Sequence, residues 1–283
     1  MAAESRDLQE NPRRPRWIIH LLLIVCCVAV ALPMIFAIIK SSQDRSQVLR
    51  YPPDFSIGSS MLTNYSDALT KYNVGRYMIN STVVALVVTA GKTVLSLLAA
   101  MAFVYFGFPL KSALFALVLA TLLMPMDILI VGLFNFVSDT LGWSNSYVAL
   151  IIPFLASATG IFLFRQHFAT IPTELADAAQ IDGAGPLRFL WNILIPNSWN
   201  VIGALALIQF IYVWNQYLWP LIIINDNDAQ MIQVGLRSVI STDAATNWGV
   251  ALASAVIASL PPLILFLLLQ DSFVRSFAPS RDK

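Results

Sequence analysis

Charge is scarce in this sequence: charged residues make up 12% of its 283 positions, whereas hydrophobic residues make up 58%. A soluble globular domain carries about 25% charged and about 45–50% apolar residues. The low charge and a mean hydropathy of +0.72 therefore exclude an ordinary soluble domain and indicate a chain that crosses a membrane several times. The net charge of +1 gives no indication of nucleic-acid binding.

Cysteine and histidine are almost absent. Cys26 and Cys27 are adjacent within an apolar run, so they offer neither a disulfide framework nor a zinc-binding spacing. We interpret them as small buried hydrophobic residues. His20 and His167 form no cluster, and no nucleophile–base arrangement emerges elsewhere. The sequence therefore disfavours a membrane-embedded enzyme, and we expect no metal and no cofactor in this chain.

Six apolar runs are long enough to cross a membrane core of about 30 Å at about 1.5 Å per helical residue. They cover residues 17–39, 78–104, 112–137, 146–164, 197–224 and 247–270. The predicted fold class is an all-α membrane protein with six transmembrane helices, flanked by tails at 1–16 and 271–283.

The basic residues before the first run predict its orientation. Arg13, Arg14 and Arg16 precede it, which resembles a secretory signal, but the run is too long and Ala31-Leu32-Pro33 is a poor cleavage site. An uncleaved span with a cytoplasmic N-terminus fits better. With six spans, both termini are cytoplasmic. The first outer loop, at 40–77, carries five basic residues, which weakens the excess of basic residues on the cytoplasmic side. The predicted orientation therefore depends on the first span and on the inner loop.

The inner loop at 172–196 predicts a short helix–turn–helix. Thr173 is a plausible N-cap and Gly183 is placed to end the first helix. A second helix is expected from Leu187 to Ile195, stopped by Pro196. The spacing puts one set of residues on a single face, open to a partner: Leu175, Ala178, Ala179 and Asp182. On periodicity alone, an ordinary amphipathic linker fits equally well.

The residues of this loop resemble the coupling motif of ABC importer permeases. The motif has an acidic residue before two alanines (Asp177-Ala178-Ala179), a glycine four residues later (Gly183), and an Ile-x-Leu-Pro ending (193–196). Asp177 replaces glutamate and Ile195 replaces leucine, and both changes are conservative. The resemblance implies a type I (MetI-like) permease fold whose coupling helix docks into the ATPase subunit. The residues implied in that coupling are Glu174, Asp177, Ala178, Ala179, Asp182 and Gly183.

Lys92 is a charged residue inside the second run. Gly91-Lys92-Thr93 looks like the end of a phosphate-binding P-loop, but Leu86 stands where that motif needs glycine. Lys92 lies roughly 18 Å from the inner end of its span, and Asp127 roughly 22 Å from the inner end of the third. Two interpretations stay open: an ion pair between them that fixes helix register, or a positive charge beside the path of an anionic substrate.

Polar side chains gather in the fifth run, and we predict that some of them line the substrate path. The candidates are Gln209, Trp214, Asn215, Gln216 and Tyr217. The aromatic members could instead form an interfacial belt. Pro125 and Pro220 break helical bonding, and such breaks often line cavities.

The resemblance extends over most of the chain and follows the carbohydrate-uptake branch of the family. The segments 155–159, 162–166 and 214–221 are similar to permease subunits for glycerol 3-phosphate. This implies uptake of sn-glycerol 3-phosphate or a glycerophosphodiester, with a sugar such as maltose or trehalose as the alternative. The implied partners are a second homologous permease, two copies of an ATPase subunit that binds ATP and Mg, an extracytoplasmic solute-binding protein and membrane lipid of the inner membrane.

A gradient-driven secondary transporter is the rival from a different class. Such proteins favour inverted repeats, broken helix pairs and carboxylates within the membrane. The sequence has one such carboxylate, Asp127, and no visible repeat. We therefore keep it only as a remote alternative.

Overall fold

The structure is a computed structural model that describes residues 16–241 and 246–277. Within these ranges every regular element is a helix. The elements in chain order are α1 Arg16–Ser41, α2 Arg45–Val48, α3 Met61–Thr70, α4 Val74–Tyr105, α5 Lys111–Leu122, α6 Met126–Phe134, η1 Asn135–Thr140, α7 Tyr147–Ile151, η2 Ile152–Phe154, α8 Ala158–Phe168, α9 Thr173–Ile181, α10 Pro186–Phe189, η3 Leu190–Leu194, α11 Ile195–Asn197, α12 Trp199–Trp214, α13 Leu218–Ile223, η4 Asn227–Ala229, α14 Ile232–Ser241 and α15 Trp248–Phe277.

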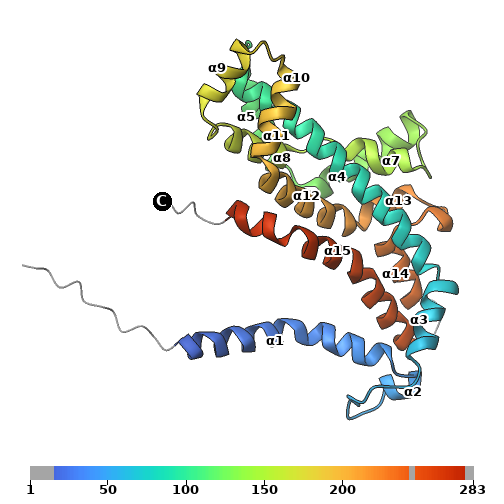
Figure 1. Cartoon of the computed structure of the whole chain (residues 1–283). Coiled ribbons are helices and arrows are strands. Elements are labelled where there is room, and N and C mark those ends of the chain that lie inside the picture. Colours follow the sequence, from blue (N-terminus) through green and yellow to red (C-terminus); the bar gives the residue numbers. More distant parts are fainter. Residues whose placement is uncertain (1–15, 242–245, 278–283) are drawn as a thin grey trace, which may run out of the picture.

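The long helix α4 runs through the centre of the molecule (Figure 1). It packs against α8 and α12, and α12 packs in turn against α15. Small residues allow these helices to approach closely: a side chain at Gly160 of α8 would collide with Ser96 of α4, and one at Gly203 of α12 with Ser272 of α15. Close contact through small residues is the usual way in which helices associate in a membrane, where no hydrophobic effect drives them together.

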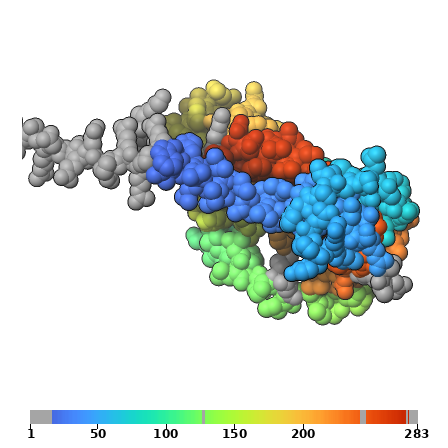
Figure 2. All heavy atoms as spheres, turned by 90° about the horizontal axis from the view of Figure 1, so that it is seen from below, coloured from blue at the N-terminus to red at the C-terminus, as the bar shows by residue number. Residues whose placement is uncertain are grey.

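Helix α1 contacts α15 towards the Ser41 end of α1, whereas the rest of α1 diverges from α15 (Figure 1) and is open in the view of Figure 2. Its apolar side chains are exposed over the length that could cross a membrane. Cys26 and Cys27 are exposed with them, so the interpretation of these residues as buried was wrong. The reason is that no helix in the described part of the chain covers their faces of α1.

Three of the predicted spans are single long apolar helices. These are Trp17–Ser41, Val74–Tyr105 and Trp248–Val274. The predicted spans at 78–104 and 247–270 are shorter than α4 and α15, because the prediction placed the helix ends where the apolar runs end. Pro261 and Pro262 lie inside α15 without ending it. The fourth predicted span, at 146–164, is a bent pair, Tyr147–Phe154 with Ala158–Phe168 at 41°. A second bent pair, Pro186–Asn197 with Trp199–Trp214 at 82°, joins the end of the 172–196 loop to the start of the fifth predicted span.

The predicted spans at 112–137 and 197–224 are each divided into two helices. The first divides into α5 and α6, with Pro125 directly before α6. The second divides into α12 and α13, with Pro220 in the first turn of α13. Proline has no N–H to donate, so it is tolerated at a helix start and disfavoured in a helix interior. The expectation that these two prolines interrupt helical bonding is confirmed.

The segment between α1 and α4 folds over one end of these helices. Gln43 is buried and donates from Nε2 to the carbonyls of Asp54 (3.0 Å) and Ser56 (2.7 Å). Asn64 of α3 donates to the carbonyls of Ser41 (2.8 Å) and Gln43 (2.9 Å). The backbone N–H of Ser56 holds the pKa of the Asp54 carboxyl below its usual range. These bonds fix a loop that sequence analysis left without structure.

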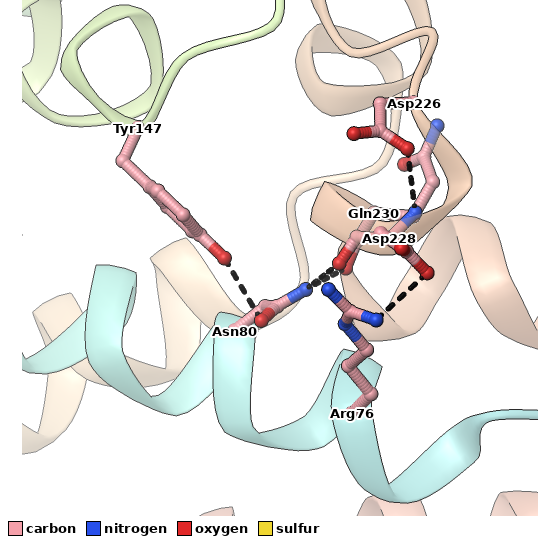
Figure 3. Close-up of polar contacts among 6 residues, drawn as sticks. All are labelled: Arg76, Asn80, Tyr147, Asp226, Asp228 and Gln230. Carbon is pink, nitrogen blue, oxygen red and sulfur yellow. Dashed lines mark hydrogen bonds and ion pairs between the residues drawn. The ribbon is translucent and has the colours of Figure 1, made fainter.

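A polar cluster, here named the outer anchor, ties the segment after α13 to α4 and α7 (Figure 3). Asn80 of α4 donates from Nδ2 to the carbonyls of Asp228 and Gln230, both at 3.0 Å, and accepts from the Tyr147 hydroxyl at 2.9 Å. Arg76 forms an ion pair with Asp228 at 2.8 Å. The outer anchor therefore joins three elements that are far apart in sequence.

Candidate functional site

The loop at 172–196 lies at one end of the molecule, beside α5 and the end of α4 (Figure 1). Gly183 ends α9 in a left-handed conformation with φ of +71°, as predicted. Its N–H donates to the Gln180 carbonyl at 3.0 Å and the N–H of Ala184 donates to the Ala179 carbonyl at 2.8 Å. This pair of bonds is the Schellman arrangement, in which glycine is favoured because it has no Cβ to strain.

The start and the second helix of this loop differ from the expectation. Pro172 precedes α9 and Thr173 is its first helical residue, without a side-chain cap. The second helical segment runs from Pro186 through the π-helical turn η3 to Asn197, so it starts one residue earlier than expected and ends one residue beyond Pro196. Proline is accommodated there because it is near the start of α11, where its missing N–H removes no bond of a long helix.

The residues expected on one face of α9 lie on two. Ala179 is buried against the protein itself, near Tyr105 and Phe189, whose rings pack edge to face at 5.0 Å. The outward face instead carries Glu174, Asp177, Ala178, Asp182 and Gly183, all exposed. Apolar side chains are exposed beside them: Leu175, Ile181, Leu187 and Trp191. Ala179 therefore positions α9, while its neighbours are free to meet another molecule.

A cavity of about 660 Å³ lies where α6, η2, α12 and α13 meet. Its lining includes the helix break predicted from Pro220, and three of the candidate residues line it: Asn215, Gln216 and Tyr217. Tyr212 and Trp219 line it as well. A largely apolar cavity with a few polar groups is the usual form of a small-molecule site.

Lys92 and Gln209 lie behind the wall of this cavity. Nζ of Lys92 donates to Oε1 of Gln209 at 3.0 Å, and Nε2 of Gln209 donates to Ser157 Oγ at 3.0 Å. Lys92 Nζ is also 5.0 Å from the centre of the Tyr212 ring, which faces the cavity. Lys92 is 6% exposed, so a membrane-buried charge is held by an amide and an aromatic ring at the edge of the site.

Two sequence candidates stand apart from this arrangement. Trp214 is buried and stacks on Phe210 at 5.7 Å, so it belongs to the packing of α12. The side chain of Asp127 lies outside the described residues, and the ion pair with Lys92 therefore stays a prediction.

Sequence analysis did not single out two polar residues of α14. Gln233 donates from Nε2 to Asn215 Oδ1 at 3.3 Å, and Arg237 donates to the hydroxyl of Tyr217. The signal was available in principle, because Gln233 and Arg237 are four residues apart and share one face of an amphipathic helix. Hydropathy gives no such signal, because both residues lie between the apolar runs at 197–224 and 247–270.

Comparison with known proteins identifies the class. Residues 92–279 match the family described as binding-protein-dependent transport system inner membrane component, and the chain belongs to that family. The resemblance inferred from the 172–196 loop is therefore confirmed. This family is a membrane component of ABC transport systems and not the enzyme that hydrolyses ATP. The described residues contain no group of His, Cys, Asp or Glu that could hold a metal ion.

Individual relatives are similar over almost their whole length. The chain is 40% identical over 264 residues to the sn-glycerol-3-phosphate transport system permease protein UgpE of Rhizobium meliloti (strain 1021), covering 90% of this chain and 93% of that protein. It is 39% identical over 274 residues to the protein of the same name in Agrobacterium fabrum, covering 94% and 97%. The likeness to glycerol-3-phosphate permeases, read from short segments, is thus confirmed.

Solved structures share the fold. A bacterial ABC transporter involved in the import of the acidic polysaccharide alginate superposes with a TM-score of 0.79 at 19% identity, over 90% of this chain and 95% of that chain. A bacterial alginate ABC transporter in complex with a pentasaccharide-bound periplasmic protein superposes with a TM-score of 0.62 at 13% identity, over 92% and 94%.

Proposed function

We propose that this chain is one of two permease subunits of an ATP-driven importer for sn-glycerol 3-phosphate or a glycerophosphodiester. The observation that carries the proposal is the cavity at the α12–α13 break, with Lys92 held at its edge. An intramembrane cation is costly unless it serves a partner or a pathway, and a phosphate-bearing solute gives it such a use. The names of relatives about 40% identical support the same substrate class.

The substrate path runs through this cavity in the proposal. Asn215, Gln216 and Tyr217 contact the solute directly, while Gln209 holds the Lys92 ammonium towards Tyr212. The related second permease closes the open side of the cavity. Asp127 lies at the first turn of α6, next to the α6 residues that line the cavity, and is kept as a path candidate on that ground.

In this proposal, the ATPase subunit binds the loop at 172–196, and its movement is transmitted to the permease through this contact. Its exposed apolar residues, especially Ile181 at 87% and Trp191 at 67%, form a surface that a soluble partner would cover. Exposed Glu174, Asp177 and Asp182 give this surface an acidic border. Two ATPase subunits bind ATP and Mg and close together. Their closure shifts the permease pair between inward-open and outward-open states.

The remaining topology follows from this assignment. The chain crosses the inner membrane six times, with the broken segment α5–α6 as the third crossing and α12–α13 as the fifth. The tails at 1–16 and 271–283 are cytoplasmic, and the outer anchor faces the extracytoplasmic solute-binding protein. The alginate transporter solved with a periplasmic protein supports a partner of that kind.

Reconstitution tests the proposal. The chain is purified with the second permease, the ATPase and the binding protein of its own organism, and placed in proteoliposomes. ATP-dependent uptake of labelled sn-glycerol 3-phosphate is the expected result, reduced by excess glycerophosphocholine and not by maltose or trehalose. Uptake of maltose or trehalose instead would favour the sugar alternative. Uptake that follows an ion gradient without ATP would contradict the ABC mechanism.

A further inference from the structure

A second cavity of about 270 Å³, here named the inner chamber, lies where α8 and the turn after it meet α12 and the end of α15. Four polar side chains line it: Gln166, His167, Thr170 and Ser276. Pockets for drug-sized ligands measure about 300–1,000 Å³. The inner chamber therefore suits a smaller solute that forms hydrogen bonds.

The inner chamber lies on the side of the 172–196 loop. Nε2 of His167 donates to the carbonyl of Asn197 at 3.1 Å, and Nδ2 of Asn197 donates to the carbonyl of Ile193 at 2.7 Å. Asn197 is the last residue of α11, so these bonds connect the lining of the chamber to the end of that loop. In the proposed topology the loop is cytoplasmic, so the inner chamber lies on the cytoplasmic side of the cavity at the α12–α13 break.

Ile208 of α12 lines both the inner chamber and the cavity at the α12–α13 break. Val201 and Ala204 precede it in the chamber, and Ile211 and Tyr212 follow it in the cavity. Steps of three or four residues put all five side chains on one face of the helix. The two cavities therefore lie end to end along this face of α12, with Ile208 at their boundary.

The side chain of Ile208 has the properties of one that limits the width of a passage. It is half-buried, and its branched Cβ leaves one strongly preferred rotamer in a helix. It also has no group that donates a hydrogen bond to a polar solute or accepts one from it. A solute that moves from the cavity to the inner chamber therefore passes a stiff apolar side chain.

We infer that Ile208 determines the size of the solute that passes from the cavity into the inner chamber on its way to the cytoplasm. This inference rests on the proposed function, since it adds a size limit to the same transport path. Glycerophosphocholine carries on its phosphate a choline group that sn-glycerol 3-phosphate lacks, so it is the larger of the two solutes. The limit at Ile208 therefore acts more strongly on glycerophosphocholine.

Ile208→Ala in the complete reconstituted importer tests the size limit. The measured quantity is the ratio of glycerophosphocholine uptake to sn-glycerol 3-phosphate uptake, each per ATP hydrolysed. We expect this ratio to rise about tenfold, because a difference of one methylene in an apolar site changes discrimination by about 10–200-fold. The same binding protein serves the unmodified and the variant importer, so a change in the ratio belongs to the permease.

Ile202→Ala is the matched control. Ile202 is a half-buried isoleucine of the same helix, about 120° around it from Ile208, and packs against the buried cluster that contains Leu205. Its replacement removes the same atoms and should leave the ratio unchanged. ATPase activity stimulated by the binding protein establishes that each complex has assembled. Ile208→Val, which removes one carbon, gives the same comparison with a smaller rise should Ile208→Ala not assemble.

The possible failures are distinguishable. An unchanged ratio in an assembled Ile208 variant, or an equal rise in Ile202→Ala, would overturn the size limit while leaving the proposed function intact. An unmodified importer that does not take up sn-glycerol 3-phosphate would instead overturn the proposed function.

Discussion

The Lys92 side chain has two roles, one in helix packing and one in the proposed substrate path. It is the donor for Gln209, and through Gln209 it links α4 to α12 and to Ser157 before α8. It also brings a positive charge next to Tyr212 at the cavity wall. A substitution therefore changes both the packing of three helices and the electrostatics of the path, and a single variant does not separate them.

Lys92→Met and the double variant Lys92→Met with Gln209→Leu separate the two roles. Met leaves the Gln209 oxygen without its donor, at a cost of about 1 kcal/mol within a membrane. Leu at 209 removes that unpaired amide, so thermal stability in detergent should recover, whereas uptake of sn-glycerol 3-phosphate should stay low in both variants. Full uptake by Lys92→Met would contradict a role in the path. Recovery by Asp127→Asn in its place would indicate the ion pair.

The backbone of Gly183 adopts a left-handed conformation, and the proposed coupling role of this residue depends on that conformation. Its φ of +71° strains any residue with a branched Cβ, although no atom lies within 4 Å of the Cβ position. Gly183→Val should cost about 1–3 kcal/mol of local strain and uncouple ATP hydrolysis from uptake. Gly183→Asn, the matched control, should remain close to the unmodified chain because asparagine tolerates this conformation. Equal uptake by both variants, at normal membrane levels, would contradict the coupling role.

The sequence identified chemistry at single positions better than it identified neighbours. Gly183 carries a local signal, since a glycine directly after a predicted helix indicates a left-handed turn from adjacent residues alone. The partner of Lys92 carries none, because Gln209 is 117 positions away. Ala178 and Ala179 are indistinguishable in helical pattern, and only the position of Tyr105 and Phe189 decides which of the two is buried.

At the scale of elements, the outer anchor shows how one side chain fixes a loop. Asn80 donates to two carbonyls of the segment after α13 and accepts from the hydroxyl of Tyr147 (Figure 3). It therefore joins α4 to α7 and to the segment between α13 and α14. The ion pair between Arg76 and Asp228 is more than half exposed on both sides, and such pairs contribute little in water.

These differences predict unequal losses of stability. Asn80→Asp keeps the shape but replaces two donors with a carboxylate beside two carbonyl oxygens, and should destabilise the chain by about 2–4 kcal/mol. Arg76→Gln should cost less than about 1 kcal/mol. Thermal unfolding of both purified variants in detergent gives the comparison. A larger loss for Arg76→Gln would mean that the ion pair, and not the amide, holds the outer anchor together.

Broken helices were the main limit of prediction at this scale. An apolar run indicates that a segment is buried in lipid or protein, and it carries no information on whether the helix within it is continuous. Pro125 and Pro220 did mark the breaks, yet Pro261 and Pro262 lie inside an unbroken helix. Whether a proline ends a helix depends on whether neighbouring elements satisfy the freed carbonyls, and that is a tertiary property.

At the scale of the whole molecule, the loop at 172–196 and the outer anchor lie at opposite ends of α4. Tyr105 at one end of α4 contacts Phe189, and Asn80 near its other end bonds Gln230. Lys92 lies between them on the same helix, and its neighbour Tyr212 of α12 lines the cavity. A movement of the 172–196 loop would therefore reach the cavity through α4 and α12, which are directly packed. Such coupling needs the two ends to face opposite sides of the membrane.

Cysteine labelling tests that arrangement in a chain with Cys26→Ser and Cys27→Ser. Tyr51, 92% exposed, and Ile181, 87% exposed, belong to the two opposite ends, while Val30, 82% exposed, lies within the apolar length of α1. A membrane-impermeant maleimide should label Tyr51→Cys in intact spheroplasts and Ile181→Cys only after permeabilisation. Val30→Cys should resist labelling in both, because lipid covers it. Labelling of Ile181→Cys from outside would reverse the orientation, and labelling of both positions from the same side would contradict the odd number of crossings expected between Tyr51 and Ile181.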